Sequence, residues 1–424
     1  MSKLDELIWE LCPDGVEFKA LKEIATVFRG GDFQKKDFIE KGFPCIHYGQ
    51  IYMLYGLFAD KTFSFISEEC ARRQKIAHKN DIIMAVTSEN LDDVCKCMAW
   101  LGDGNVAISG HSVIIRHNQN AKFLTYFFQT EMFSLQKKRL AHGTKVVEIS
   151  PDKLLSIVVP VPPLPVQQEI VRILDNFTLL TAELTAELTA RKKQYAYYRD
   201  SLLSFEIGQY SIEWKTLEEI FQLRNGYTPS RGNKEYWENG TIPWFRMDDI
   251  RTNGNILEDS IQHISSKAVK RDLFPANSIL LATSATVGEH ALITVDSLAN
   301  QRFINCSIRK YLRDRISPRY LYYYFYVIDN WCKKNTRKSN FPTVDMEVLK
   351  KYKIPLPPLD VQQRIVDVLD NFEKICSDLN IGLPAEIEAR KKQYEYYRDA
   401  LLTFAETGDI IFTDRQTDRQ TESD

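Results

Sequence analysis

The chain has 424 residues, of which 55 are Lys or Arg and 57 are Asp or Glu, so its formal net charge is −2 with neutral histidines. Hydrophobic residues make up 44% and charged residues 26%, which excludes a disordered, collagen-like or polybasic tail protein. This length allows about two or three domains. The first residues lack the basic and apolar pattern of a secretory signal, and no apolar run is long enough to span a bilayer. We therefore expect a cytoplasmic protein.

Residues 1–160 are expected to form a mixed α/β domain. Asp81–Val86 and Val106–Arg116 have the apolar, β-branched composition of strands. Lys122–Arg139 has the apolar periodicity of an aromatic-rich amphipathic helix.

Residues 161–206 are predicted to form a long helix. A cluster of prolines at 162, 163 and 165 ends the preceding strand and allows a helix to begin. About forty helical residues would span roughly 60 Å, enough to separate two domains. Apolar side chains recur at spacings of three and four, which is typical of a coiled-coil seam. The seam consists of Ile170, Ile173, Phe177, Leu180, Leu184, Leu188, Tyr195, Tyr198 and Leu202.

The seam changes phase inside TAELTAELTA at 181–190, a repeat of four residues. Each TAEL unit would lengthen the helix by about 6 Å and rotate it by about 40°. One apolar position per turn lets units be added or lost without breaking the helix. We interpret the segment as a length-adjustable spacer; the alternative is slippage in a repetitive gene without effect.

The rest of the chain repeats this organisation. PPLPVQQEIVRILDNF at 162–177 returns as PPLDVQQRIVDVLDNF at 357–372, and ARKKQYAYYRDSLLSF at 190–205 returns as ARKKQYEYYRDALLTF at 389–404. We therefore predict a second mixed α/β domain over 207–356, with a strand at Ile279–Thr283 and a helix at Pro318–Lys334. Each copy needs its own core, so we expect a pseudo-twofold molecule and not a solenoid.

The second helical segment occupies 357–405. Its seam consists of Ile365, Val368, Phe372, Ile375, Leu379, Tyr394, Tyr397 and Leu401. Gly382 and Pro384 should break or kink this helix. The two helical segments bury their seams most economically against each other, as an antiparallel pair. The polar, acidic stretch 406–424 is expected to be a disordered tail.

No catalytic site is recognisable in the sequence. It lacks a phosphate loop, a G-x-S-x-G elbow, an H-E-x-x-H zinc helix and the Asn/Asp-Pro-Pro-aromatic motif of amino-methylating enzymes. Glu17-x-Lys19 and Glu213-x-Lys215 resemble half of a nuclease metal site, but a repeated surface strand explains them better. The eight cysteines form no pair of C-x2-C knuckles, so we expect reduced thiols and no metal site. The sequence therefore predicts a non-catalytic protein.

Local basic patches recur at corresponding places in the two halves. Such clusters neutralise phosphates, and Arg, Asn and Gln in loops read base edges. The alternative for each residue is a solvated charged face. The candidate DNA-binding residues are Arg72, Arg73, Lys75, Lys137, Lys138, Arg139, His142, Thr144, Lys145, Arg224, Arg231, Arg246, Arg251, Arg337, Lys338 and Asn340.

Two dissimilar domains, each followed by PPL-x-x-QQ-x-IV-x-x-LD-x-F and ARKKQY-x-YYRD-x-LL-x-F, resemble the specificity (S) subunit of type I restriction-modification systems. The resemblance implies that each domain is a target recognition domain that reads one half of a bipartite, asymmetric, gapped sequence in double-stranded DNA. It also implies that the helices set the gap and dock two methyltransferase (M) subunits, which restriction (R) subunits join.

S-adenosylmethionine, ATP and Mg would then bind to the partner subunits, and this chain would hold no cofactor. Two other functions stay open at this point. The chain could be the recognition part of a fused methyltransferase-nuclease, or a coiled-coil adaptor without DNA recognition.

Overall fold

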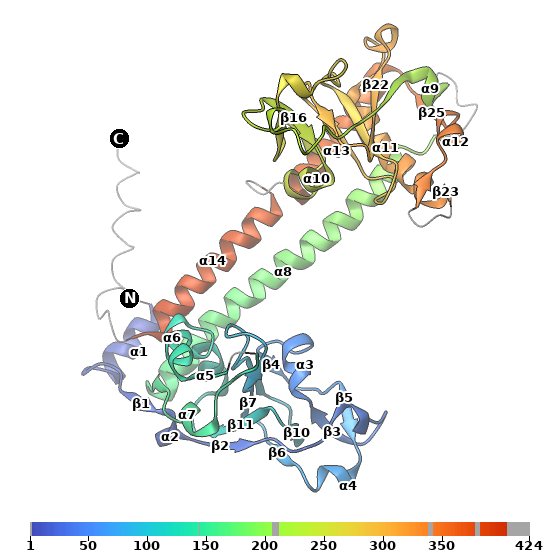
Figure 1. The fold of residues 1–424 in the computed structure, drawn as a ribbon. Helices are drawn as coiled ribbons and strands as arrows, with labels where there is room; N and C mark the ends of the chain where they lie inside the picture. Colours follow the sequence, from blue (N-terminus) through green and yellow to red (C-terminus); the bar gives the residue numbers. More distant parts are fainter. Residues whose placement is uncertain (1, 144, 206–211, 338–341, 378–381, 405–424) are drawn as a thin grey trace, which may run out of the picture. The chain divides into compact units, whose positions relative to one another are not determined.

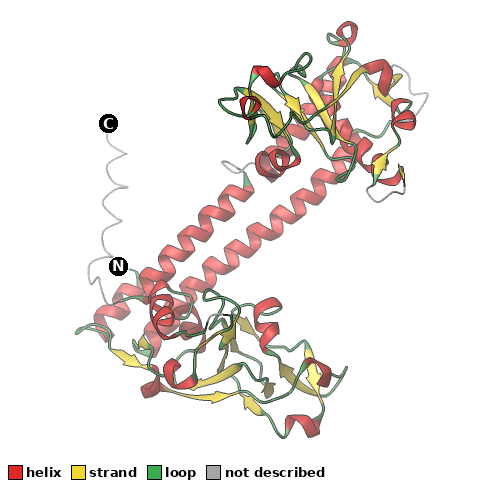
Figure 2. Cartoon of the chain, viewed as in Figure 1, coloured by secondary structure: helices red, strands yellow, loops and turns green. Residues whose placement is uncertain are grey.

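A computed structural model of the chain describes residues 2–143, 145–205, 212–337, 342–377 and 382–404. The chain divides into two compact units. Unit 1 comprises Met1–Thr185 and Glu386–Asp424, and unit 2 comprises Ala186–Ala385. Each unit contains a mixed α/β domain and parts of long helices, as the sequence predicts (Figures 1 and 2). Among the described residues, no helix combines the length and the apolar character that crossing a bilayer requires.

The domain of unit 1 follows a short N-terminal helix, α1 (Lys3–Leu11), whose Lys3 pairs with the buried Glu169 at 3.2 Å. The elements after α1 are β1 (Phe18–Ala20), α2 (Leu21–Ile24), β2 (Ala25–Arg29), β3 (Phe43–Ile46), α3 (Tyr48–Met53), β4 (Phe58–Ala59), β5 (Ser64–Ile66), α4 (Glu68–Ala71), β6 (Lys75–Ala77), β7 (Ile82–Ala85), β8 (Thr87–Ser88), β9 (Cys97–Trp100), β10 (Val106–Ile108), β11 (Ser112–His117), α5 (Ala121–Phe127), α6 (Glu131–Leu140), β12 (Val147–Glu148), α7 (Pro151–Leu154) and β13 (Val158–Pro160).

A five-stranded sheet with the order β2-β11-β7-β9-β4 forms the centre of this domain. Both of its faces are covered, so every residue of β7 is buried. Ile82 and Met84 pack in the core with α5, whereas Ile83 and Ala85 pack on the other face with α3 and β10. This alternation is the period of two that a strand imposes on its side chains.

The domain of unit 2 has the same framework. Its elements are β14 (Glu213–Thr216), α9 (Leu217–Ile220), β15 (Phe221–Asn225), β16 (Ile242–Phe245), α10 (Met247–Asn253), β17 (Ile256–Leu257), β18 (His263–Ile264), β19 (Ser278–Ala282), β20 (His290–Ile293), β21 (Leu298–Ala299), β22 (Phe303–Ile308), α11 (Pro318–Lys334), β23 (Thr336–Arg337), β24 (Thr343–Val344), α12 (Met346–Lys350) and β25 (Lys353–Leu356). The sheet order β15-β22-β19-β20-β17 reproduces that of unit 1, strand for strand. The predicted duplication is therefore confirmed in the fold of each unit.

Helix α8 (Leu164–Leu202) runs unbroken for 39 residues (Figure 2). In unit 1, its first half packs beside α14 (Leu383–Leu402), and the ring of Phe177 stacks on that of Tyr397 at 5.4 Å. In unit 2, its second half packs beside α13 (Leu359–Ser377), and Tyr198 stacks on Phe372 at 5.4 Å. The ARKKQY block after the first domain therefore packs in unit 2, and the later copy packs in unit 1.

The first glutamine of the PPL-x-x-QQ motif connects each domain to its long helix through hydrogen bonds. Gln362 is fully buried; its amide nitrogen donates to the carbonyls of Arg315 and Pro357, and its oxygen accepts from Ser317 N at 2.9 Å. Ser317 is the N-cap of α11. Gln167 bonds in the same way to Pro162 O and to the N-cap residue of α5.

The repeated aspartate of LD-x-F makes a second such joint. Asp175 accepts from the Lys122 ammonium at 2.6 Å and from the Tyr126 hydroxyl at 2.7 Å. Asp370 accepts in the same way from Arg319 and Tyr323, which lie on α11. The repetition of these motifs thus has a structural cause, because each copy fixes one domain on one helix.

Several predicted elements need correction. The predicted strand Val106–Arg116 is two strands, because the chain turns at His111, whose φ is +63°. The predicted helix Lys122–Arg139 is two helices, because Thr130 caps α6 by accepting a hydrogen bond from Phe133 N. The strand at Ile279–Thr283 and the helix at Pro318–Lys334 are β19 and α11.

The predicted seam is wrong at Leu180, Val368 and Ile375, which are 47%, 41% and 43% exposed. The reason is that each helix also packs against a domain, so other apolar positions, such as Leu174 and Leu369, are fully buried. The helix breaks near Gly382 and Pro384 as predicted, since α13 ends at Ser377 and α14 begins at Leu383. Leu379 and the predicted tail at 406–424 lie outside the described residues.

Candidate nucleic-acid interface

Unit 1 has a cleft of about 410 Å³ at the end of β2. Its walls come from three separate segments: residues 31–35 after β2, His47 and Tyr48 where β3 passes into α3, and the turn before β11 that contains His111. Their rings form a row, with centroids 4.6 Å apart for His47 and Tyr48 and 5.1 Å apart for Tyr48 and His111. The cleft is therefore lined by aromatic and polar side chains together.

Unit 2 has a cleft of about 340 Å³ that shares two of these three walls, the segment after the first sheet strand and the start of the following helix. Arg246 lies between β16 and α10, as His47 lies between β3 and α3. The other walls carry Arg231, Lys234, Trp237 and Glu238 after β15, together with Gln262 before β18. The two clefts thus share two walls of one framework, differ in the third wall, and are lined with different side chains.

A glycine directly follows the first strand of the five-stranded sheet in each unit. At Gly30, directly after β2, a Cβ would lie 2.0 Å from the carbonyl oxygen of Ser109. At Gly226, directly after β15, a Cβ would lie 2.1 Å from the carbonyl oxygen of Asn300. Neither position accommodates a side chain, because both loops pass against the backbone of the turn before the long central strand.

The cations of the unit 2 cleft are poorly paired. Arg231 and Lys234 have no ion-pair partner among the described residues. The Arg246 guanidinium lies 5.9 Å from the Trp244 ring and 3.8 Å from an Asp248 carboxylate oxygen. Its Nε atom is buried and has no hydrogen-bond partner in the described part of the chain. The cleft therefore has three cations against one acid, Glu238, and the shortest ion pair that one of these cations makes among the described residues is 3.8 Å long.

His47 is a different kind of group. It is 8% exposed, and its Nδ1 accepts a hydrogen bond from Gly49 N at 3.2 Å. Burial lowers the pKa of His47, and the neighbouring charges of Lys35 and His111 lower it further. The ring is therefore neutral near pH 7, with its remaining proton on Nε2 as a donor.

Helix α6 and the hairpin that follows it carry six of the nine predicted first-half residues. Strand β12 pairs with β8, and the bridge between His142 and Glu148 closes the hairpin. Glu148 pairs with Arg29 at 3.3 Å, which joins the hairpin to the end of β2 beside the cleft. Exposed candidates on this surface are Lys138, Arg139, His142 and Lys145, and Thr144 lies outside the described residues.

Lys137 is a correction to the predicted set. It is 7% exposed, and its ammonium donates to the carbonyls of Asp92 and Val94 at 2.9 Å and 3.1 Å. Burial lowers the pKa of Lys137. Its side chain fixes the loop 86–95 to α6, so it is not available to bind DNA.

The other first-half candidates lie beside the cleft of unit 1. Arg72, Arg73 and Lys75 are exposed around Gln74, whose side chain exchanges hydrogen bonds with Asp32. That contact, aided by the charge of Arg73, lowers the pKa of Asp32.

In unit 2, the structure brings Arg231 and Arg246 together in the cleft. Arg224 does not line this cleft, and its guanidinium donates instead to the carbonyls of Asp272 and Leu273. Arg251 is exposed on α10, 4.0 Å from Asp248. The Arg337 side chain, Lys338 and Asn340 lie outside the described residues.

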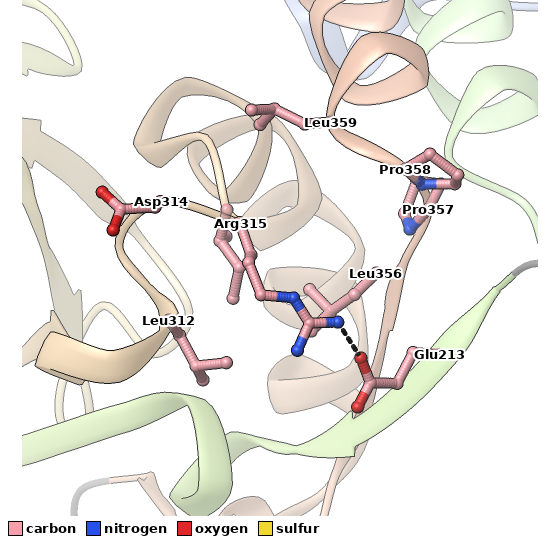
Figure 3. Close-up of a pocket in the computed structure, with 9 residues that line it drawn as sticks. Glu213, Leu312, Asp314, Arg315, Leu356, Pro357, Pro358 and Leu359 are labelled. Atoms are coloured by element: carbon pink, nitrogen blue, oxygen red, sulfur yellow. Dashed lines mark hydrogen bonds and ion pairs between the residues drawn. The ribbon is translucent and has the colours of Figure 1, made fainter.

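A further cleft of about 260 Å³ lies where the domain of unit 2 meets α13 (Figure 3). Pro357, Pro358 and Leu359 form one wall, and Arg315 donates to Glu213 at 2.6 Å across it. It belongs to the joint between domain and helix. No group of three or more metal-ligating side chains occurs within the described ranges.

The sequence interpretation missed His47, Tyr48 and His111, and in unit 2 Lys234, Trp237 and Gln262. They come from segments far apart in the sequence, so no local motif contains them. Aligning the two halves outside the near-identical blocks would have shown that His47 and Arg246 follow equivalent strands.

Comparison with known proteins identifies the family. The family model described as "Type I restriction modification DNA specificity domain" matches residues 13–191 and again residues 211–389. The chain belongs to this family. The two matches cover one repeat each, which agrees with the duplicated fold.

Curated relatives are type I specificity subunits. The EcoprrI specificity subunit of Escherichia coli is 53% identical over 203 residues, which is 46% of this chain and 51% of the relative. The EcoR124I/EcoR124II specificity subunit of E. coli is 42% identical over 254 residues, 57% of this chain and 60% of the relative. The matched part thus spans about half to three fifths of these relatives. A putative specificity subunit of Haemophilus influenzae is 32% identical over 70% of this chain and 75% of its own length.

Solved structures share the fold. A chain from a structure on complex assembly and conformational transition of the type I R-M system has a TM-score of 0.63 and 18% identity, and the match covers 92% of this chain and 98% of that chain. The HsdS subunit of Thermoanaerobacter tengcongensis has a TM-score of 0.54 and 17% identity, covering 92% and 97%.

Proposed function

We propose that this chain is the DNA specificity subunit of a type I restriction-modification complex. The observation that carries the proposal is the match of both repeats to the specificity domain family, on two units with one framework and differently lined clefts. One framework with two surfaces suits a bipartite, asymmetric target, because each domain meets a different half of the sequence.

In this proposal, residues 1–160 and 207–356 are the two target recognition domains, and residues 161–206 and 357–405 form the helical spacer. The exposed cations at the end of α6 and on the hairpin, among them Lys138, Arg139 and Lys145, contact the phosphate backbone. Their exposure and their position beside β2 support that role.

The chain itself is proposed to be non-catalytic and to act in the cytoplasm, where its eight free thiols suit a reducing compartment. Two M subunits dock on the helices and bind S-adenosylmethionine, and R subunits supply ATP- and Mg-dependent cleavage. A net charge of −2 suits a subunit whose partners share the phosphate contacts.

The test is co-purification followed by DNA binding. The full chain should co-purify with an M subunit of its source strain, and the complex should bind DNA of one gapped sequence above physiological salt. Non-specific binding fades with salt, because it depends on counterion release. A complex that binds all sequences equally at every salt concentration would contradict the proposal, and so would a chain that binds S-adenosylmethionine alone.

A further inference from the structure

We propose that the two equivalent clefts read base edges, with Arg246 as the specificity-determining residue of unit 2 and His47 as that of unit 1. The inference deepens the proposed function and rests on it. The ligand is the floor of a duplex DNA groove, met once by each cleft at a different half of the target.

The first support is a constant framework with a variable lining. Both clefts follow the first strand of the five-stranded sheet, and in each unit that strand is followed directly by a glycine with no room for a Cβ. At the position after β3 or β16, the side chain is His47 in one unit and Arg246 in the other. Two domains that recognise different DNA sequences need this combination, because the backbone framework is kept and the side chains that contact DNA differ.

The second support is the unused bonding capacity of Arg246. Its backbone is fixed, because its N–H donates to the buried Asp249 carboxylate at 2.6 Å. Its side chain is 27% exposed, and its one ion pair among the described residues, with Asp248, is long at 3.8 Å. A guanidinium held in this way presents a planar set of donors, which matches the O6 and N7 acceptors of guanine. We therefore expect a guanine in the half-site that unit 2 reads.

The third support is that His47 has a different capacity. Because Nδ1 accepts a hydrogen bond from Gly49 N, the neutral ring has one N–H left to donate, at Nε2. The Arg246 guanidinium has several N–H donors. Lys35, which has no ion-pair partner among the described residues, and His111 surround it. A single donor beside the Lys35 ammonium selects a different base from the one that a guanidinium fork selects.

Phosphate binding is the competing use of the same cations. Arg251 on α10 and His142 on the hairpin are exposed and suit phosphate contacts, which strengthen binding to all sequences alike. The partly buried Arg246 and His47 lie beside aromatic rings within clefts. Base reading and phosphate binding therefore predict different results for the two pairs of residues.

The experiment expresses the full chain with its M subunit in a methylation-free host and maps N6-methyladenine over the genome. Arg246→Gln should relax the sequence only in one half-site, and His47→Gln only in the other. At an affected position, preference for the original base should fall about tenfold to a hundredfold. The matched controls Arg251→Gln and His142→Gln should leave both half-sites unchanged.

Some outcomes would overturn the inference. One is an unchanged motif with uniformly weaker methylation, which indicates phosphate contacts; another is relaxation of both half-sites by one substitution. A variant complex that methylates nothing is assayed for binding to duplexes altered at single positions. Lost discrimination within one half-site supports the inference, and equally weak binding to every duplex contradicts it. If the unsubstituted chain directs no gapped motif, the proposed function itself fails.

Discussion

Replacing Gln362 with leucine should destabilise unit 2 and leave unit 1 unchanged. The substitution removes a fully buried side chain that bonds Ser317 N and the carbonyls of Arg315 and Pro357. A buried polar group left without a partner costs about 1–3 kcal/mol. Two of the three hydrogen bonds are only part-buried, so we take about 1 kcal/mol for each partner group left without a hydrogen bond. The three groups together then reduce the free energy of unfolding by about 3 kcal/mol. For a unit of this size, that loss lowers the unfolding midpoint by about 6–12 °C.

The assay is amide hydrogen exchange of the full chain, read separately on peptides of each unit. Exchange should accelerate in α11, β25 and α13 and stay constant in the sheet of unit 1. Gln363→Leu is the matched control, because Gln363 is the next residue and its side chain is exposed. This substitution should change the free energy of unfolding by no more than about 0.5 kcal/mol. Gln167→Leu should give the mirror result in unit 1. Equal effects of Gln362→Leu and Gln363→Leu would refute the reasoning.

Three further predictions concern charge, pH and length. Burial lowers the pKa of His290 to about 4, below the value of ~6.5 for an exposed histidine. As the pH falls, the unfolded state therefore binds the proton first. The free energy of unfolding of unit 2 should drop by about 3 kcal/mol between pH 6.5 and pH 4. Hydrogen exchange of β20 measures this loss, and His290→Gln should abolish it. Lys138→Met should weaken DNA binding and flatten its salt dependence, whereas Lys137→Met should lower thermal stability, because two carbonyls lose their donor. One TAEL unit added at 181–188 lengthens α8 by about 6 Å and should widen the gap in the methylated motif by one or two base pairs; an unchanged gap would contradict the spacer role.

The repeated blocks made most of the framework predictable. Near-identical segments 195 and 199 positions apart predicted two domains and their helices, and the break at Gly382 and Pro384 follows from backbone chemistry. The prediction that Leu180 lies in the buried seam was wrong. The spacing of apolar residues along one helix cannot show that the helix packs against both a domain and another helix. The turn at His111 follows Ser109-Gly110, a turn signal that the strand-like residues on both sides outweighed in the prediction.

The clefts could not be predicted from local pattern. His47, Lys35 and His111 meet only after β3, β10 and β11 are placed in their sheets. Charge counting ranked Lys137 with its neighbours, although one position along a helix changes which side chain faces the core. Arg231 and Arg246 were found from sequence because arginine in a loop is itself a signal for nucleic-acid contact.

The central claim is that this chain decides which DNA sequence is methylated. The most direct measurement is a genome-wide map of N6-methyladenine in the source strain, with the gene intact and deleted. The account predicts that deletion removes methylation from one asymmetric, gapped motif and from no other. Methylation of that motif in the deletion strain would contradict it, and so would a source strain that expresses the M subunit and carries no gapped motif at all.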